Sequence, residues 1–367
     1  MFIATVPAVG EDTSHLPAFD FTKLSAVNTC PKWGVIRYGH HKTFATKNRA
    51  MALEAGESCH QVFSAVRCAD LFLYGEQLYG PEIKARAVKH MHRLFDRRLP
   101  SGLLDTHRTD GWVTRLTDHN EDERTNLIVS SLYILETTGY VDDPYDKRRT
   151  LDKLSEAIIA YVDRYEFGVS LPYVTENFVG IEVPFDLLVT YRTSENTPIR
   201  KCRFYGRVDG VHAFRNDLTN PIIEENKTAS RINDAWEMSF EMSHQVTGYI
   251  ASAAANIGHP INMARIRGLS IPQPRMHDGN GVVNITVTRR EHQFQQWAEW
   301  FMHTADLFFE YIDKPIDSPT YTVACNRYFR PCSFIPLCAS PYDEQVAMFN
   351  DDMVIDAWSP LDEKSSD

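Results

Sequence analysis

The sequence predicts a mixed α/β fold in which a helical region precedes a strand-rich region. Between residues 61 and 172, apolar residues recur at helical spacing, as in Leu154, Ile158 and Val162. From about Val174 the pattern changes. The stretches NFVGIEVPFDLLVTY and CRFYGRVDGVHAF are rich in β-branched and aromatic residues, which is typical of strands.

Turn residues and helix caps divide these regions into elements. A helical segment at 46–73 comes first, and the helical region after it is broken near 100–102 and 142–144. PIIEENKT is the third strand of the strand-rich region. Asn233 or Asp234 then caps a helix that ends at Gly258 and Pro260. NMARIRGLSI and GVVNITVTRR are further strands, and HQFQQWAEWFMHTADLFFEYI is a long amphipathic helix.

These elements divide the chain into five segments. They are an N-terminal segment (1–60), the helical region (61–172), the strand-rich core (173–316), a cysteine segment (317–340) and an acidic tail (341–367).

Composition and charge place the chain among globular proteins. Of its 367 residues, 43% are hydrophobic and 24% are charged. No apolar run is long enough for a membrane span, and the N-terminus lacks the basic and apolar regions of a secretion signal. We therefore expect a cytoplasmic protein.

The net charge is unevenly distributed. The tail carries eight acidic residues and one lysine, so it contributes −7 of the net charge of −11. The preceding residues are only mildly acidic, so the overall charge neither supports nor excludes a nucleic-acid partner. Because Met353-Val354-Ile355 and Ala357-Trp358 stand among the acids, the tail could be an interaction peptide or could cover a basic groove. The plain interpretation is a solvated terminus, which we favour.

The cysteines do not indicate a disulfide framework. There are seven of them, an odd number, and the chain has no secretion signal. Cys325, Cys332 and Cys338 lie close together near the C-terminus, which points to metal or cluster ligation. We expect Cys59, Cys68 and Cys202 to be ordinary buried thiols.

The chemistry concentrates on two neighbouring strands. Alternate side chains of a strand share a face, so Glu225 and Lys227 point one way and Glu224 points the other. If the strands pair, Asp209 joins Glu225 and Lys227 at one end of the sheet. Two carboxylates suit Mg²⁺ or Mn²⁺, and the lysine can neutralise charge that develops in a transition state. Glu224 is the alternative carboxylate if the register differs.

On the following helix, Gln245 and Tyr249 are four residues apart and so lie on one face. Both side chains can hydrogen-bond water, phosphate or a catalytic lysine. Glu182, in the preceding strand, can either assist this site or lie on an edge strand; we favour the edge strand.

These residues resemble the motifs of the PD-(D/E)XK nucleases, in the RecB-like exonuclease branch. The resemblance rests on Gly206-Arg207-Val208-Asp209-Gly210, on Ile223-Glu224-Glu225-Asn226-Lys227-Thr228, on Gln245-x3-Tyr249 and on Gly56-x3-His60. It implies a restriction-endonuclease-like core at 173–316, with a central mixed sheet flanked by helices and a helical insertion.

The resemblance also implies roles for individual residues. His60, Asp209, Glu225 and the backbone carbonyl of Asn226 would bind Mg²⁺ or Mn²⁺. Lys227 would be the catalytic lysine, with Gln245 and Tyr249 as the residues of the helix motif.

A second resemblance concerns the cysteines. Cys30-Pro31 and the aromatic and basic residues after it are similar to the start of the iron–sulfur RecB-like nucleases, among them the CRISPR-associated exonucleases. This implies that Cys30, Cys325, Cys332 and Cys338 hold a 4Fe-4S cluster. The chain departs from the common pattern, since six residues separate Cys325 from Cys332 where two are usual. Structural Zn²⁺ is the alternative, because four thiolates also bind it.

We therefore expect a metal-dependent DNA exonuclease that acts on single-stranded DNA or DNA ends, in recombination, repair or phage DNA processing. A protein partner in a recombination or replication complex fits this setting, in a bacterial or phage-infected host cell. The first alternative is a catalytically silent nucleic-acid-binding or scaffold protein with a nuclease fold. The second is a sequence-specific endonuclease. Several arginines, among them Arg200, Arg203 and Arg207, are candidates for phosphate contacts.

Overall fold

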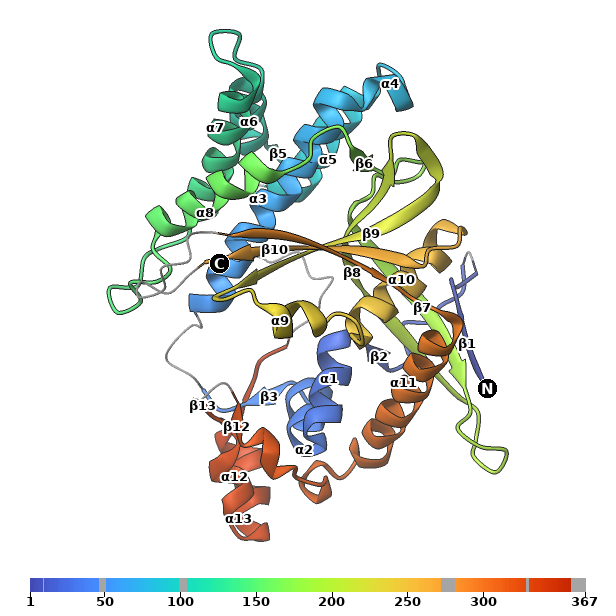
Figure 1. Cartoon of the computed structure of the whole chain (residues 1–367). Coiled ribbons are helices and arrows are strands. Elements are labelled where there is room, and N and C mark those ends of the chain that lie inside the picture. Colours follow the sequence, from blue (N-terminus) through green and yellow to red (C-terminus); the bar gives the residue numbers. More distant parts are fainter. Residues whose placement is uncertain (9, 46–50, 99–103, 272–280, 328–329, 358–367) are drawn as a thin grey trace. The chain divides into compact units, whose positions relative to one another are not determined.

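The computed structural model describes residues 1–8, 10–45, 51–98, 104–271, 281–327 and 330–357 (Figure 1). The chain divides into two units. Unit 1 comprises Met1–Asn48, Pro184–Arg207 and Arg290–Asp367, and unit 2 comprises Arg49–Val183 and Val208–Arg289. Two long strands, β7 (Ile181–Tyr191) and β8 (Arg200–Phe214), run from one unit into the other.

The helices of the first part of unit 2 pack around one long helix, α3 (Met51–Tyr74). The others are α4 (Glu76–Tyr79), α5 (Ile83–Phe95), α6 (His107–Leu116), α7 (Glu123–Glu136) and α8 (Leu151–Arg164), with a short hairpin of β4 (Arg97–Arg98) and β5 (Leu104–Asp105) between α5 and α6. The helical spacing in the sequence thus gives helices that bury apolar residues.

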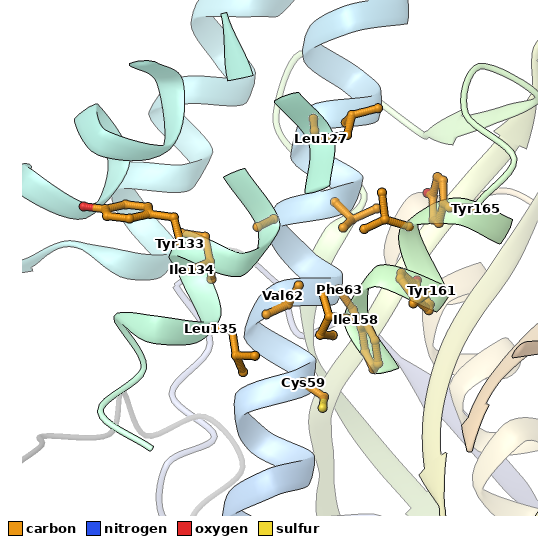
Figure 2. Close-up of a cluster of buried hydrophobic side chains, with 14 of the residues drawn as sticks. Cys59, Val62, Phe63, Leu127, Tyr133, Ile134, Leu135, Ile158, Tyr161 and Tyr165 are labelled. Carbon is orange, nitrogen blue, oxygen red and sulfur yellow. The ribbon is translucent and has the colours of Figure 1, made fainter. Parts of the chain in front are cut away.

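Figure 2 shows the core that these helices share. Val62 and Phe63 of α3 pack against Ile134 of α7 and Ile158 of α8, and all four side chains are buried. Burying a side chain of this size contributes about 1.5–3 kcal/mol to stability. The core therefore fixes α3 within unit 2.

The sheet of unit 2 is mostly antiparallel. β6 (Ser170–Pro172) and β9 (Asp217–Ala229) each pair antiparallel with β8. β10 (Met263–Ser270) is parallel to β9 and antiparallel to β11 (Val282–Thr288). Residues 221–226 of β9 are all buried, so both faces of this strand are covered.

Between β9 and β10 the structure has two helices where the sequence predicted one. Asn233 caps α9 (Asp234–Met238), and Ser243 caps α10 (His244–Ile257). The Ser243 side chain accepts a hydrogen bond from the backbone of Val246, and such serine bonds compete with a continuing helix. Gly258 ends α10 in the left-handed conformation that glycine adopts easily, as predicted.

Unit 1 joins elements from both ends of the chain. Its first part contains β1 (Phe2–Thr5), β2 (Ala18–Phe19), α1 (Phe21–Thr29), α2 (Pro31–Gly34), the π-helix η1 (Val35–Gly39) and β3 (Lys42–Thr43). β1 is antiparallel to β7, and β2 is parallel to β8. The long helix α11 (Glu291–Tyr311) packs against α1. Aromatic rings contribute to this packing, as where Phe308 of α11 meets Phe19 of β2 edge to face.

The C-terminal part of unit 1 is a series of short elements. They are η2 (Pro315–Asp317), η3 (Thr322–Ala324), the paired β12 (Asn326–Arg327) and β13 (Arg330–Pro331), α12 (Ile335–Ala339), α13 (Tyr342–Ala347), the π-helix η4 (Met348–Asp352) and β14 (Val354–Ile355).

Residues 353–356 of the acidic tail pack against the N-terminal part of unit 1, which corrects the interpretation of a solvated terminus for this stretch. β14 pairs antiparallel with β3, and the side chain of Met353 is buried beside Ile36 and Phe334. Arg37 forms an ion pair with Asp356 at 2.6 Å. Apolar residues between the acids dock this part of the tail, because they bury surface that acids alone would leave exposed.

None of the helices in the described part of the chain combines the length and the apolar character that a membrane crossing requires.

Candidate active site

The register of β8 and β9 brings the two predicted carboxylates together. Gly210 pairs with Glu224, so Asp209 lies across from Glu225 on the neighbouring strand. The backbone N–H of Asn226 donates to Oδ2 of Asp209 at 2.8 Å. This bond orients the Asp209 carboxylate toward β9.

Lys227 lies beside Glu225, as strand alternation predicts. Its Nζ donates to Oε1 of Glu225 at 2.6 Å. Burial disfavours the charged lysine, but the carboxylates of Glu225 and Asp209 outweigh it and raise the pKa of Lys227. The side chain is therefore an ammonium ion at neutral pH, suited to stabilising negative charge.

The carboxyl group of Glu225 is buried and only partly satisfied by hydrogen bonds. It is 3% exposed, and its Oε2 has no hydrogen-bond partner among the described residues. Burial raises the pKa of Glu225 to about 7, and the nearby Asp209 carboxylate adds to the rise although Lys227 opposes it. A buried oxygen without a partner, next to a second carboxylate, is a setting that a bound cation would relieve.

Glu224 points to the other face of β9 and is part of a buried ion-pair network. Its Oε1 accepts from Nε of Arg265 at 2.6 Å and from Nε of Arg267 at 2.8 Å. His212 and these arginines hold the pKa of Glu224 well below its usual value despite burial. Glu225, rather than Glu224, therefore shares the face of Asp209.

His60 reaches the same carboxylates from α3. Its Nδ1 lies 3.5 Å from Oδ2 of Asp209. Burial lowers the pKa of His60, and the Lys227 cation adds to this effect although Asp209 opposes it. The imidazole is therefore neutral at pH 7, which is the form that binds metals.

Gly56 lies one turn before His60 on α3. A Cβ atom at this position would stand 3.4 Å from the hydroxyl of Thr228, which is an ordinary van der Waals distance, so the space around Gly56 does not require glycine.

Glu182 is a residue that sequence reasoning undervalued. Val211 of β8 donates to the carbonyl of Gly180, which brings the start of β7 alongside the part of β8 that carries Asp209. Ser64, one turn after His60, donates to Oε1 of Glu182 at 2.6 Å. The backbone of Glu182 has a φ of 49°, a strained conformation for a residue other than glycine. The available signal was a carboxylate at the start of the strand before Asp209.

Gln245 and Tyr249 lie together on α10. Nε2 of Gln245 donates to the hydroxyl of Tyr249 at 3.1 Å. The helix packs against β9 and β10, so the pair belongs to the same unit as the carboxylates.

The four predicted cluster cysteines line one pocket in unit 1. Cys30 comes from the N-terminal part of the chain, and the other three, Cys325, Cys332 and Cys338, come from its C-terminal part. The pocket has a volume of about 20 Å³ and is also lined by Trp33.

The thiols of this pocket show two features that matter for ligation. The backbone N–H of Phe334 donates to Sγ of Cys332 at 3.5 Å. Burial raises the pKa of Cys332 and of Cys338, and the neighbouring thiols add to the rise in both. A cation would therefore be needed to hold them as thiolates, and a set of four thiol donors fits either an iron–sulfur cluster or Zn²⁺.

Within the described residues, no group of three or more His, Cys, Asp and Glu side chains is arranged so that it could hold a metal ion. His60, Asp209 and Glu225 gather without forming a closed ligand shell, and the four thiols face a shared pocket in the same way. Cys59, Cys68 and Cys202 are each 0% exposed, in agreement with their interpretation as buried thiols.

Two of the arginines proposed for phosphate contacts are already paired with acids. Nε of Arg200 lies 2.9 Å from Oδ1 of Asp306, and Arg203 forms an ion pair with Asp186. On the helical side, Arg108 of α6 donates to Oε1 of Gln61, the residue after His60.

Comparison with known proteins adds little to this description. No protein-family model and no curated protein matches the chain. Among solved structures, a candidate exonuclease from Eubacterium rectale is similar over 92% of this chain and 99% of its own, with 9% sequence identity and a TM-score of 0.36. Because this TM-score is below 0.5, we draw no conclusion about fold or activity from it.

Proposed function

We propose that the protein is a metal-dependent deoxyribonuclease of the PD-(D/E)XK type, in the RecB-like branch, acting on single-stranded DNA or DNA ends. The observation that carries the proposal is the convergence of His60, Asp209, Glu225 and Lys227 from α3, β8 and β9. A catalytically silent nucleic-acid-binding or scaffold protein is the alternative.

Each of these side chains has a role in phosphodiester hydrolysis. His60, Asp209 and Glu225, with the backbone carbonyl of Asn226, would hold Mg²⁺ or Mn²⁺. When bound, the metal would polarise the phosphate and lower the pKa of a water molecule. The ammonium of Lys227 stabilises the charge that develops on the phosphate. Gln245, through its amide, and Tyr249, through its hydroxyl, orient the water or the phosphate.

We propose further that Cys30, Cys325, Cys332 and Cys338 hold a 4Fe-4S cluster, or structural Zn²⁺ as the alternative. The support is that all four thiols line one pocket although they come from opposite ends of the chain. We propose that it acts in the cytoplasm of a bacterial or phage-infected cell, beside recombination or replication proteins.

The exchange of Asp209 for asparagine tests the nuclease proposal. Asp209→Asn keeps an oxygen for the N–H of Asn226 but removes the charge that a divalent cation needs. We expect cleavage of end-labelled DNA in Mg²⁺ or Mn²⁺ to fall at least about 100-fold, by analogy with the loss of a charge-stabilising group.

Asp217→Asn is the matched control, since Asp217 begins β9 at the other end of the same strand pair. Full cleavage by this variant, together with unchanged circular dichroism of both variants, would assign the effect to the site. An Asp209→Asn protein that cleaves as fast as the wild type would overturn the proposal.

A further inference from the structure

A buried arginine lies directly behind the candidate site. Arg67 is on α3, about two turns after His60, and its side chain is 0% exposed. Its Nη1 donates to the backbone carbonyl of Asp209 at 3.0 Å. The same helix therefore reaches Asp209 twice, once at its carboxylate through His60 and once at its backbone.

Arg67 also contacts the neighbouring strand, through Asn226. The amide of Asn226 satisfies both of its ends when its oxygen faces Arg67. The oxygen then accepts from both terminal nitrogens of Arg67, at 3.3 Å for Nη1, and the nitrogen donates to the hydroxyl of Tyr161 at 3.1 Å. Asn226 is itself fully buried, and its backbone N–H bonds the Asp209 carboxylate. One guanidinium thus bonds both Asp209 of β8 and Asn226 of β9, the residue that follows Glu225.

The surroundings of Arg67 make this connection rigid. Its Nε lies 3.9 Å from Oε2 of Glu224, which Arg265 and Arg267 hold in place from β10. Each member of a buried charged network needs the others to compensate its charge. Moving one side chain would leave its partners uncompensated, so the network resists rearrangement. The planar fork of arginine is also suited to bonding two acceptors at fixed positions.

We infer that Arg67 and Asn226 are positioning residues, which set the separation of the Asp209 and Glu225 carboxylates and so the affinity for the divalent cation. The inference rests on the proposed function and extends it to two side chains, those of Arg67 and Asn226, that touch neither metal nor DNA; the Asn226 ligand is its backbone carbonyl, which the substitutions leave in place. Groups that orient metal ligands from behind commonly change metal affinity by about 10- to 100-fold when they are removed.

The test measures Mn²⁺ binding to the full-length protein directly, by electron paramagnetic resonance. We expect Asn226→Ala and Arg67→Lys to weaken Mn²⁺ binding by about 10- to 100-fold. At saturating Mn²⁺, kcat on single-stranded DNA should fall while KM for DNA stays unchanged, since neither residue contacts DNA. Asn226→Asp keeps an acceptor for Arg67 and should recover most of the Mn²⁺ affinity.

Arg289→Lys is the matched control. Arg289 is another buried arginine of unit 2, at 3% exposed, and its hydrogen bonds go to Thr247, Phe240 and Thr288. This variant should lose thermal stability and keep the wild-type Mn²⁺ affinity. If Arg67→Lys does not fold, Asn226→Ala and Asn226→Asp carry the test.

The outcomes separate the inference from the function on which it rests. If the wild type binds Mn²⁺ and cleaves DNA while Asn226→Ala merely loses stability, as Arg289→Lys does, the two residues are structural and the inference is overturned. If the wild type neither binds Mn²⁺ nor cleaves DNA, the proposed function fails and the inference falls with it.

Discussion

At the scale of single residues, the main feature of the site is that two adjacent glutamates have opposite pKa shifts. Glu224 is buried among arginines that hold its pKa low, whereas burial raises the pKa of Glu225 to about 7. The difference follows from strand alternation, because neighbouring side chains meet opposite faces of the sheet. A buried network thus fixes the strand through one glutamate and leaves the next one for chemistry.

This arrangement predicts a pH-dependent stability of the metal-free protein. The folded-state pKa of Glu225 lies above the value of 4.5 for an unperturbed glutamate. The protonated Glu225 therefore makes its full contribution to the free energy of unfolding below about pH 4.5, and this contribution is lost as the pH rises through about 7. Glu225→Gln resembles the protonated form, so in EDTA its Tm should exceed that of the wild type at pH 8.

The two proteins should have similar Tm values at pH 5, where Glu225 of the wild type is protonated. Differential scanning calorimetry at both pH values measures the difference. Tm values that differ by the same amount at pH 5 and pH 8 would show that Glu225 does not titrate in this range.

At the scale of elements, the sequence was most informative where the contacts are local. The shared face of Glu225 and Lys227 follows from the period of two in a strand, and the end of α10 follows from Gly258. The register that sets Asp209 across from Glu225 depends on the pairing of β8 with β9, which the sequence left as a condition. The positions of Arg67 and Glu182 could not be predicted in the same way. Both depend on the approach of α3 to the strands, which is a tertiary contact with no local pattern.

The break between α9 and α10 has a related explanation. Asn233 and Ser243 are both good caps, and the apolar spacing alone did not show that both would be used. Likewise, the many acids of the tail favoured a solvated terminus although apolar residues stand among them. In the structure Met353 is buried and β14 pairs with β3.

Because the tail is docked, we predict that alanine substitutions at two methionines, Met353 and Met238, change stability by different amounts. Met353 is 6% exposed in the core of unit 1, whereas Met238 on α9 is 71% exposed. Met353→Ala should lower the free energy of unfolding by about 2–3 kcal/mol, because it removes buried methylene groups and leaves a cavity. Met238→Ala should change it by no more than about 0.5 kcal/mol. Urea unfolding followed by tryptophan fluorescence gives both values; equal effects would mean that the tail is not docked in solution.

At the scale of the whole molecule, the chain passes from unit 1 into unit 2 and back twice. The segments of unit 1 at the two ends of the chain are joined by β3 with β14, by α1 with α11 and by the pocket of the four cysteines. A group bound by those cysteines would cross-link the two ends, and a cross-link stabilises chiefly by restricting the unfolded chain. Its role would therefore be structural.

This role predicts that the cysteines of the pocket differ from the other buried cysteines. Cys30→Ala and Cys332→Ala should lose iron or zinc after anaerobic purification, as measured by inductively coupled plasma mass spectrometry. Cys202→Ala should keep the wild-type metal content, since Cys202 is buried but does not line the pocket. A visible absorption band in the wild type would identify an iron–sulfur cluster, and a colourless zinc protein would favour the alternative.

Limited proteolysis distinguishes a structural cross-link from a group that is merely bound. Unit 2 has its own core of buried side chains from α3, α7 and α8, which does not involve the cysteine pocket. In Cys30→Ala, proteolysis should therefore remove the C-terminal part of unit 1 first, while fragments of unit 2 persist. The cross-link would be refuted if wild type and Cys30→Ala gave the same cleavage rates despite different metal contents, because the ends of the chain would then be held by packing alone.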